Sequence, residues 1–255
     1  MSGAARLLPG PIGVVLFLAL WQIYCATSGI SPLLLPTPLQ VLRAFVEVMG
    51  EAPTWNHLSY TLGETLAGFG IALVVGVVLG WLIASSLLLE RAVHPFVVAS
   101  QIVPKVALVP LFVLWFGFGP TSKVVVSAVI AFFPIMTNTL LGLRSVDPGH
   151  DDVFQALRAT RWQRFWQLQL PSAMPAILAG MEMAVVLATI GAVVGEYLGG
   201  SDGLGYFAVA TMNAFQTDRL FAIIMLLTLM GFILYLAIAA LRRVILPWQR
   251  KAVGE

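Results

Sequence analysis

Long apolar stretches separated by short polar ones dominate the pattern along the chain. A helix needs roughly 20 apolar residues to cross the hydrocarbon core of a membrane. The chain contains six stretches of about this length, each with few or no charged residues inside it. We therefore predict six membrane-spanning helices, over residues 11–29, 65–89, 93–116, 124–143, 176–198 and 220–241.

The first stretch has an alternative interpretation, a cleaved signal peptide. Only Arg6 precedes the apolar run, and no small-x-small cleavage site follows it. Both features favour a membrane-spanning helix.

Composition supports a membrane protein. Hydrophobic residues make up 59% of the 255 and charged residues only 10%, whereas soluble domains carry about 25% charged residues. The single cysteine, Cys25, excludes a disulfide framework or a cysteine metal cluster. No GxxxxGK[ST] or GxGxxG pattern occurs, so the chain itself is expected to hold no nucleotide. We predict an all-α membrane protein with no metal, no cofactor of its own and no nucleic-acid partner.

Residues between the first two spans predict a linker at the membrane surface. Prolines at 32, 36 and 38 interrupt regular structure, and residues 39–49 suit a short amphipathic helix. An interfacial linker is favoured over a binding site. The apolar face expected for this helix consists of Leu42, Phe45, Val46 and Met49.

The distribution of basic residues predicts the orientation in the membrane. Six spans place both termini on one side, and the side richer in lysine and arginine is cytoplasmic. Arg43, Lys123 and Arg219 lie at or near the other side. The cytoplasmic set is Arg6, Arg91, Arg144, Arg158, Arg161, Arg164, Arg242, Arg243, Arg250 and Lys251.

The longest polar interruption, residues 151–175, then lies in the cytoplasm. Asp147 followed by Pro148 predicts a helix start, and Asp151 and Asp152 suit the first helical turn. The helix presents one apolar edge, formed by Val153, Phe154 and Leu157.

A second short helix is expected after a bend near residues 158–160. Thr160 and Gln163 form a T-x-x-Q capping box. Pro171 should end this helix, and Ser172 should cap the entry into the fifth span.

Two interpretations of this polar stretch remain. Arginines and tryptophans suit a loop lying on lipid headgroups. An acidic helix start with an apolar edge is better matched to a groove on a soluble protein.

Charged residues inside the spans need a partner or a water-filled cavity. Lys105, Glu182 and Glu196 could line a transport path. Alternatively, Lys105 pairs with a glutamate inside the bundle, and Glu196, near water at the external end, caps the turn over residues 199–205. Glu64 and His57 are expected to be solvated.

Two GxxxG steps predict close helix packing. Gly76 and Gly80 form the first, in the second span. Gly191 and Gly195 form the second, which we expect near the axis of a dimer.

The polar stretch resembles the cytoplasmic EAA loop of permease subunits of type I ABC importers. That pattern reads E-A-A, three residues, Gly, nine residues, Ile-x-Leu-Pro. Asp152 falls at the glutamate, Arg158 at the glycine and Leu168 at the isoleucine, before Leu170 and Pro171. Val153 and Phe154 replace the two alanines. Arginine at the glycine position is expected either to extend the helix or to reach an acidic residue of the ATPase.

Other segments resemble the permease subgroup for nitrate, taurine, aliphatic sulfonates and pyrimidine vitamin precursors or riboflavin. They are LLLPTPLQVLRAF, VPKVALVPLFVLWFGFGPTSKVVV, FFPIMTNTLLGLRSVD, GAVVGEYLGGSDGLGY and LRRVILPW.

The resemblance implies a non-catalytic permease of a bacterial inner membrane, with six spans and a cytoplasmic coupling helix between the fourth and fifth. It implies a homodimer, two ATPase subunits that bind ATP and Mg, and a periplasmic or lipid-anchored binding protein. Three regions follow: 1–60, a transmembrane domain over 61–245 with its coupling loop at 147–172, and a cytoplasmic tail at 246–255. The implied coupling residues are Asp151, Asp152, Val153, Phe154, Leu157, Arg158 and Arg161.

A different class of function remains open, an ion-coupled secondary transporter acting alone. It needs an ion relay, for which Lys105, Glu182 and Glu196 are the candidates. Such transporters usually show an internal repeat, and no convincing repeat occurs here. A purely structural membrane subunit is a third interpretation, but it leaves the acidic helix start unexplained.

Overall fold

The computed structural model describes residues 9–247, with side chains from Ile12 onward; Arg6, Arg250, Lys251 and most of the predicted tail lie outside this range. Among the described residues there is no strand, and the predicted all-α fold is confirmed. The α-helices are α2 (Pro9–Thr27), α3 (Pro38–Gly50), α4 (Ala52–Ala84), α5 (Leu87–Ile102), α6 (Val109–Phe116), α7 (Pro120–Arg144), α8 (Pro148–Ala156), α9 (Arg161–Arg164), α10 (Leu170–Gly199), α11 (Leu204–Asn213) and α12 (Thr217–Ile245). A 3₁₀ turn, η1 (Lys105–Leu108), precedes α6, and a π-helical turn, η2 (Phe165–Gln169), joins α9 to α10.

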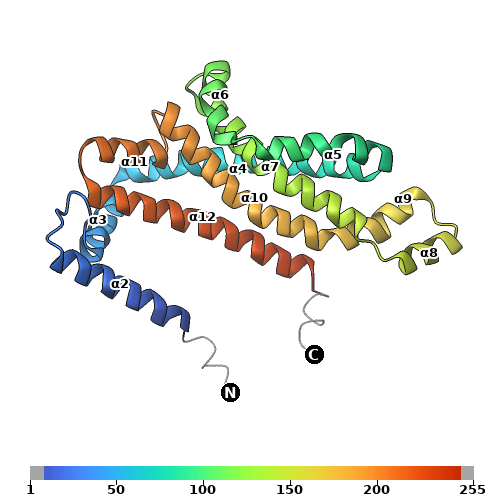
Figure 1. Ribbon diagram of the computed structural model, residues 1–255, viewed down its shortest axis with the longest axis horizontal. Helices are drawn as coiled ribbons and strands as arrows, with labels where there is room; N and C mark the ends of the chain where they lie inside the picture. The colour runs from blue at the N-terminus through green and yellow to red at the C-terminus, as the bar shows by residue number, and fades with distance from the viewer. Residues whose placement is uncertain (1–8, 248–255) are drawn as a thin grey trace.

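Four of these helical runs are long and apolar enough to cross a membrane: α4, α7, α12 and the continuous run Arg161–Gly199. The helix α2 coincides with the first predicted span and is 19 residues long. Figure 1 shows α4, α7, α10 and α12 running between two ends of the molecule, with α8 and α9 at one end and α3 and α11 at the other.

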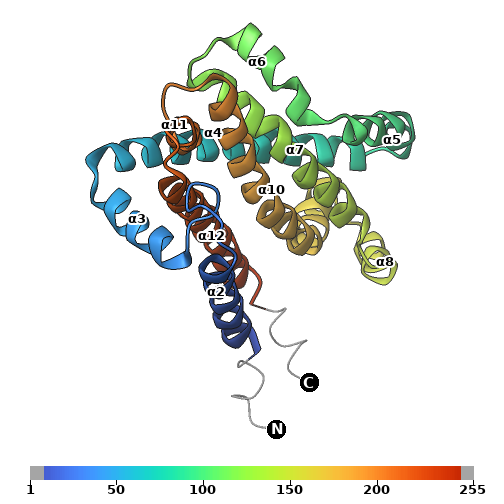
Figure 2. The ribbon, with the colours of Figure 1, turned by 60° about the vertical axis from the view of Figure 1, so that its left-hand side comes forward.

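The third predicted span is not continuous. The chain breaks after Ile102, and the segments Leu87–Ile102 and Lys105–Phe116 are bent by 81° (Figure 2). Pro104, which lacks a backbone N–H and cannot continue the helix, lies at the break. The bounds predicted for the second span were also wrong, because α4 runs from Ala52 to Ala84. Its predicted last residues belong to the next helix, α5, which Ser86 caps by accepting a hydrogen bond from the Leu89 N–H.

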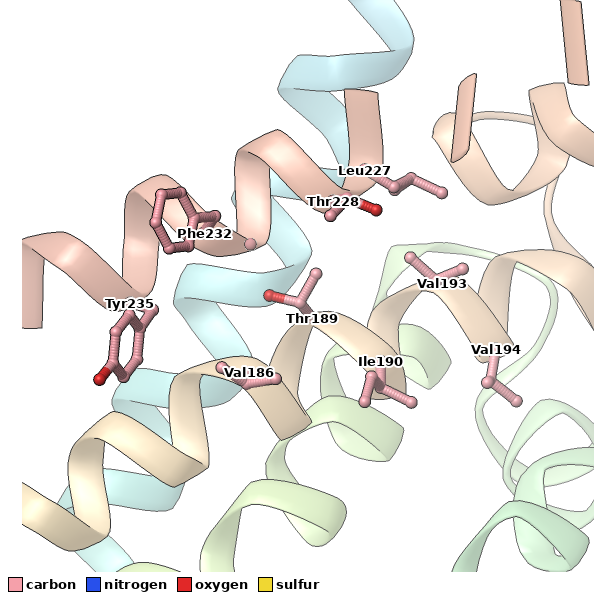
Figure 3. A pocket seen from close by; sticks show the side chains of 10 residues that line it. Val186, Thr189, Ile190, Val193, Val194, Leu227, Thr228, Phe232 and Tyr235 are labelled. Carbon is pink, nitrogen blue, oxygen red and sulfur yellow. The ribbon is translucent and has the colours of Figure 1, made fainter. Parts of the chain in front are cut away.

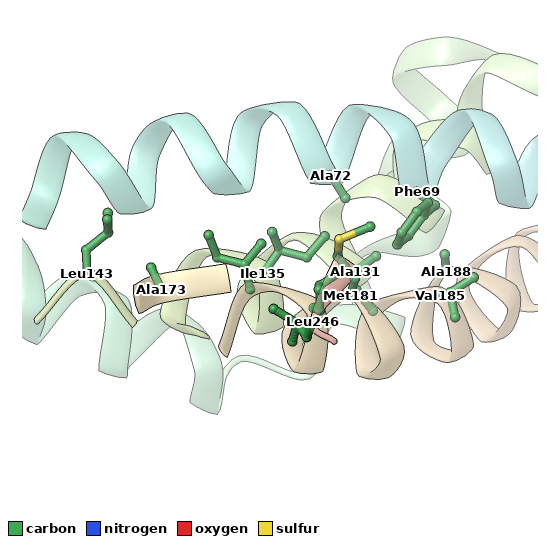
Figure 4. Packing of buried hydrophobic residues seen from close by; sticks show 13 residues of the cluster. Phe69, Ala72, Ala131, Ile135, Leu143, Ala173, Met181, Val185, Ala188 and Leu246 are labelled. Atoms are coloured by element: carbon green, nitrogen blue, oxygen red, sulfur yellow. The ribbon is translucent and has the colours of Figure 1, made fainter. Parts of the chain in front are cut away.

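The core forms where α7 packs against both α4 and α10. Gly80 of α4 faces α7 so closely that an added Cβ would lie 2.7 Å from Thr139 Cβ. Gly191 of α10 approaches the Ser127 Cα in the same way, at 2.7 Å. Both GxxxG steps therefore mediate helix packing, as predicted, and the second one packs on α7 of the same chain. The buried cluster around these contacts (Figure 4) comprises Phe69, Ala72, Ala131, Ile135, Leu143, Ala173, Ile177, Leu178, Met181, Ala184, Val185, Ala188 and Leu246.

A second apolar cluster joins α3 to α11 and α12. The capping box of Thr37 and Gln40 begins α3, as its sequence allows. Of the predicted apolar face of this helix, Leu42 and Val46 are exposed, whereas Phe45 and Met49 pack against the cluster. The side of α3 that packs inward carries Val41, Ala44 and Val48.

Candidate functional site

The loop between α7 and α10 begins as the sequence predicts. The Asp147 side chain accepts a hydrogen bond from the Gly149 N–H, at 2.7 Å between Oδ1 and N, and Pro148 is the first residue of α8. Asp151 lies in the first turn, where a carboxylate is favoured by the helix dipole.

Arg158 ends this helix in a left-handed conformation, with φ of 53°. The Arg158 N–H donates to the Gln155 carbonyl at 2.9 Å, and the Ala159 N–H donates to the Phe154 carbonyl at 3.0 Å. These two bonds form a Schellman motif, in which the left-handed position is usually glycine. The predicted bend is confirmed, whereas the expectation that arginine extends the helix was wrong.

The second helix starts at the predicted capping box. The Gln163 N–H donates to Thr160 Oγ1, and the Thr160 N–H donates to Gln163 Oε1 at 2.9 Å. Pro171 does not end this helix, because the π-helical turn η2 carries the chain directly into α10 and places Pro171 in its first turn. Proline is tolerated there, since η2 already diverts the hydrogen-bond ladder. The predicted cap at Ser172 is therefore wrong.

The helix α8 has no buried residue. Val153 and Leu157 are exposed, the latter at 74%, and Phe154 is half-buried. One ion pair, between Asp151 and Arg164, ties the helix to the membrane-spanning run. The loop thus presents an apolar edge, with the exposed Asp152, Arg158 and Arg161 beside it.

Lys105 lies in η1, at the break in the third span, with its Nζ 4.6 Å from the centre of the Phe133 ring. Within residues 9–247 it forms no ion pair, so the predicted pairing with a glutamate is wrong. Glu182 does have a partner, Arg242 of α12, at 3.4 Å.

Glu196 is 1% exposed and accepts two hydrogen bonds. The Thr61 hydroxyl donates to Oε1 at 2.7 Å, and the Gly205 N–H donates to Oε2 at 2.6 Å. The predicted capping of the 199–205 turn is confirmed. The expectation that Glu196 lies near water was wrong, because α4 and the start of α11 cover the carboxylate.

Sequence reasoning missed the residues around Glu196. Glu64 and Lys123, expected at a solvated end, are 5% and 3% exposed and form an ion pair with 3.7 Å between Oε1 and Nζ. His57 also has a structural partner, because the Gly203 N–H donates to its Nδ1 at 3.1 Å. We call Thr61, Glu64, Lys123 and Glu196 the buried charged cluster; it joins α4, α7 and α10 to the turn before α11. A buried Lys or Glu is rarely left without a partner, but nothing local in the sequence says which helices meet.

A hollow of about 430 Å³ lies between α10 and α12 (Figure 3). None of Lys105, Glu182 or Glu196 lines it. Its lining is mostly apolar and consists of Val186, Thr189, Ile190, Val193, Val194, Leu227, Thr228, Gly231, Phe232 and Tyr235.

Among residues 12–247, no group of three His, Cys, Asp or Glu side chains is arranged to hold a metal ion. The charged residues described above have protein partners or face the surface, and their arrangement offers no nucleophile paired with a base.

Comparison with known proteins identifies the fold and the family. The chain is similar to the methionine ABC transporter MetNI in an inward-facing conformation, with a TM-score of 0.65 and 18% identity, over 83% of this chain and 98% of that one. It is also similar to an amino acid ABC transporter, with a TM-score of 0.58 and 17% identity over 81% of this chain and 94% of that one.

Sequence relatives are more similar. The formylaminopyrimidine transport permease protein ThiX of Halalkalibacterium halodurans is 40% identical over 93% of this chain and 94% of its own length. The riboflavin transport system permease protein RibX of Chloroflexus aurantiacus is 36% identical over 94% of this chain and 89% of its own length. The taurine transport system permease protein TauC of Escherichia coli is 30% identical over 92% of this chain and 87% of its own length.

Residues 73–251 match the family described as binding-protein-dependent transport system inner membrane component. The chain therefore belongs to this family, and it is a multi-pass, non-catalytic permease subunit of an ABC importer of the bacterial inner membrane.

Proposed function

We propose that this permease forms the translocation path for a small polar solute, which a substrate-binding protein delivers and two ATPase subunits drive across the membrane. The observation that carries the proposal is α8, a short helix with no buried residue that ends in a left-handed turn. A helix whose apolar edge stays exposed at the end of a membrane bundle suits a groove on a soluble partner.

The proposed ATPase contact is the exposed side of the loop. Leu157 and Val153 would enter an apolar groove, while Phe154 anchors the helix between groove and bundle. Movement of the groove would reach α10 through the Asp151–Arg164 ion pair and the continuous helical run Arg161–Gly199. The complete proposed set is Asp151, Asp152, Val153, Phe154, Leu157, Arg158 and Arg161.

The proposed transport path includes Lys105 and Glu182. Lys105 lies at a break in the third span, where irregular backbone in a membrane needs protein or a water-filled cavity around it. Its charge would favour an anionic or hydrogen-bond-accepting solute. Glu196 would not contact the solute itself; it would affect the path by holding the turn over residues 199–205 in place.

The solute class follows from the relatives. ThiX is named for formylaminopyrimidine, RibX for riboflavin and TauC for taurine. We propose that the solute is a pyrimidine or vitamin precursor. The alternative solute is a small anion similar to a sulfonate or to nitrate.

Two copies of the chain are proposed to enclose the path, with both termini in the cytoplasm. The described basic residues support this orientation. Arg144 ends α7 just before α8 and pairs with Glu90, the residue before Arg91, and Arg243 lies in the last turn of α12. In the proposed division of the chain, the transmembrane domain starts at residue 61, a position inside α4, and the coupling loop spans 147–172.

Co-purification tests the proposal. The full chain, tagged at Glu255 and extracted from its host in mild detergent, should bring an ATPase subunit in equal amount. Phe154→Asp and Leu157→Asp should abolish the association. Val244→Asp is a matched control, because Val244 is as exposed as Leu157, at 76%, but lies on α12. Isolation of the chain alone, with solute transport in liposomes that needs no ATP, would overturn the proposal in favour of a secondary transporter.

A further inference from the structure

A second hollow lies at the α8–α9 end of the bundle, under the start of the long helical run. Its volume is about 540 Å³, and α4, the end of α7, α9 and η2 surround it. Unlike the apolar hollow between α10 and α12, its walls are about equally polar and apolar. The lining residues are Trp81, Ala84, Ser85, Leu143, Arg161, Trp162, Arg164, Phe165 and Gln169.

Two arginines supply the charge of this hollow. Arg164 is paired with Asp151, so its charge is partly compensated. Arg161 forms no ion pair within the described part of the chain and no hydrogen bond through its side chain there. The lining contains no carboxylate of its own, and with Asp151 counted beside it the hollow keeps one uncompensated positive charge.

The π-helical turn η2 shapes the same wall. Both of its terminal residues, Phe165 and Gln169, line the hollow, and the Gln169 amide has no side-chain partner in the described structure. Single π-helical turns inside α-helices cost stability and concentrate at functional sites. Here the distortion places a free amide on the same side as the arginines.

The hollow also lies at the level of the membrane surface. It is located where α4 and α7 end, and Trp81 packs edge-on against Phe165, with ring centres 5.8 Å apart. Trp162 and Trp166 continue this aromatic group at 5.4 Å. Tryptophans gather at the headgroup level of a membrane, and Trp81 and Leu82 of α4 stay exposed, as a helix against acyl chains would.

We propose that this hollow binds the phosphate headgroup of an anionic phospholipid. Arginine binds phosphate through two parallel N–H···O bonds, and Arg161 is free to do so. The Gln169 amide would donate to a headgroup oxygen. The acyl chains would run along the exposed apolar side of α4, which a soluble phosphate compound could not use. This site goes beyond solute transport, and of its lining residues only Arg161 also belongs to the proposed ATPase contact.

Lipid retention tests the site. The full chain, with whatever subunits accompany it, is placed in nanodiscs of equal phosphatidylglycerol and phosphatidylcholine, transferred to detergent, and analysed by native mass spectrometry for retained lipid. The wild-type chain should retain phosphatidylglycerol over phosphatidylcholine. Arg161→Gln should reduce this preference about tenfold, because it removes the charge-assisted hydrogen bonds to the phosphate. Arg243→Gln, which changes an exposed arginine on α12 outside the hollow, should leave the preference unchanged.

Two further variants separate the effect of charge from the effects of side-chain geometry and loop structure. Arg161→Lys retains the charge but loses the two-pronged geometry, so it should recover only part of the preference. Arg164→Gln also removes the Asp151 pair and can disturb the loop, so Arg161→Gln, which breaks no ion pair, decides the outcome.

Two results would overturn the proposal. One is equal retention of phosphatidylglycerol by Arg161→Gln and the wild-type chain. The other is displacement of the lipid by millimolar inorganic phosphate, which would assign the hollow to a soluble phosphate compound. Co-purification of the ATPase is tested with Phe154→Asp and Leu157→Asp, and neither residue lines the hollow, so the two proposals fail separately.

Discussion

At the scale of single residues, the glycine at 203 depends on a side chain seven positions earlier. Gly203 has φ of +98°, and an added Cβ would lie 2.1 Å from Glu196 Oε1. The buried carboxylate therefore needs glycine here for two reasons, backbone conformation and space.

Gly203→Ala is expected to destabilise the chain by about 3 kcal/mol, from left-handed strain and from overpacking. Gly29→Ala separates the two effects, because Gly29 also has a positive φ, +67°, but open space around it. It should cost only about 1 kcal/mol. Thermal unfolding midpoints in detergent measure both. Equal losses in the two variants would show that Glu196 does not restrict position 203.

The ion pair of Glu64 and Lys123 makes a second prediction at this scale. Lys123→Met leaves a buried carboxylate without its cation, which typically costs 3–5 kcal/mol. The double variant Lys123→Met/Glu64→Gln removes the unpaired charge and should recover a large part of that loss. Unfolding midpoints of the single and double variants test the pair. A double variant less stable than Lys123→Met would contradict it.

Arg158 connects the residue scale to the element scale. Its left-handed conformation costs roughly 1 kcal/mol that glycine would avoid. Arg158→Gly should therefore slow hydrogen exchange of the α8 amides several-fold. Ala159→Gly, one position beyond the left-handed residue, should speed exchange, because it only adds freedom to the unfolded loop. Faster exchange in Arg158→Gly would indicate that the arginine side chain itself holds the turn.

At the scale of helices, the packing of α4 on α7 depends on glycines facing large residues. Gly80→Ala would bring a Cβ within 2.8 Å of the Met136 carbonyl oxygen, so the helices must separate. We expect a loss of about 1–3 kcal/mol. Gly70→Ala lies on the same helix with open space around it, and it should stabilise by up to about 1 kcal/mol through helix propensity. Opposite shifts of the unfolding midpoint would confirm the packing, and shifts of the same sign would contradict it.

At the scale of the whole molecule, the two ends of the bundle differ in charge and in what they expose. Cys25 is the only cysteine, so Cys25→Ser gives a background for labelling. Leu157→Cys, near α8, should react with a membrane-impermeant maleimide only from the cytoplasmic side. Phe215→Cys, exposed after α11, should react only from outside. Labelling of intact cells and of inverted vesicles measures this, and the reverse pattern would invert the proposed orientation.

The sequence by itself determined the features that depend on neighbouring residues. Apolar runs predicted an all-α membrane protein, Asp147 and Thr160 predicted helix starts, and the loop resembled the correct family. Capping and hydrophobic runs act over a few residues, so local pattern is sufficient for them. Local pattern is not sufficient for every proline. Pro104 lies at a break in a span, whereas Pro171 lies in the first turn of a continuous helix.

The tertiary structure alone decided which charges meet. Thr61 and Glu196 are 135 positions apart, and Lys123 pairs with Glu64 across two helices. Such contacts depend on helix rotation and register, which are set by where Gly80 and Gly191 let α4 and α10 approach α7. The same packing left α8 uncovered and opened the hollow beneath Arg161, since a bundle that buries one set of faces must leave others exposed.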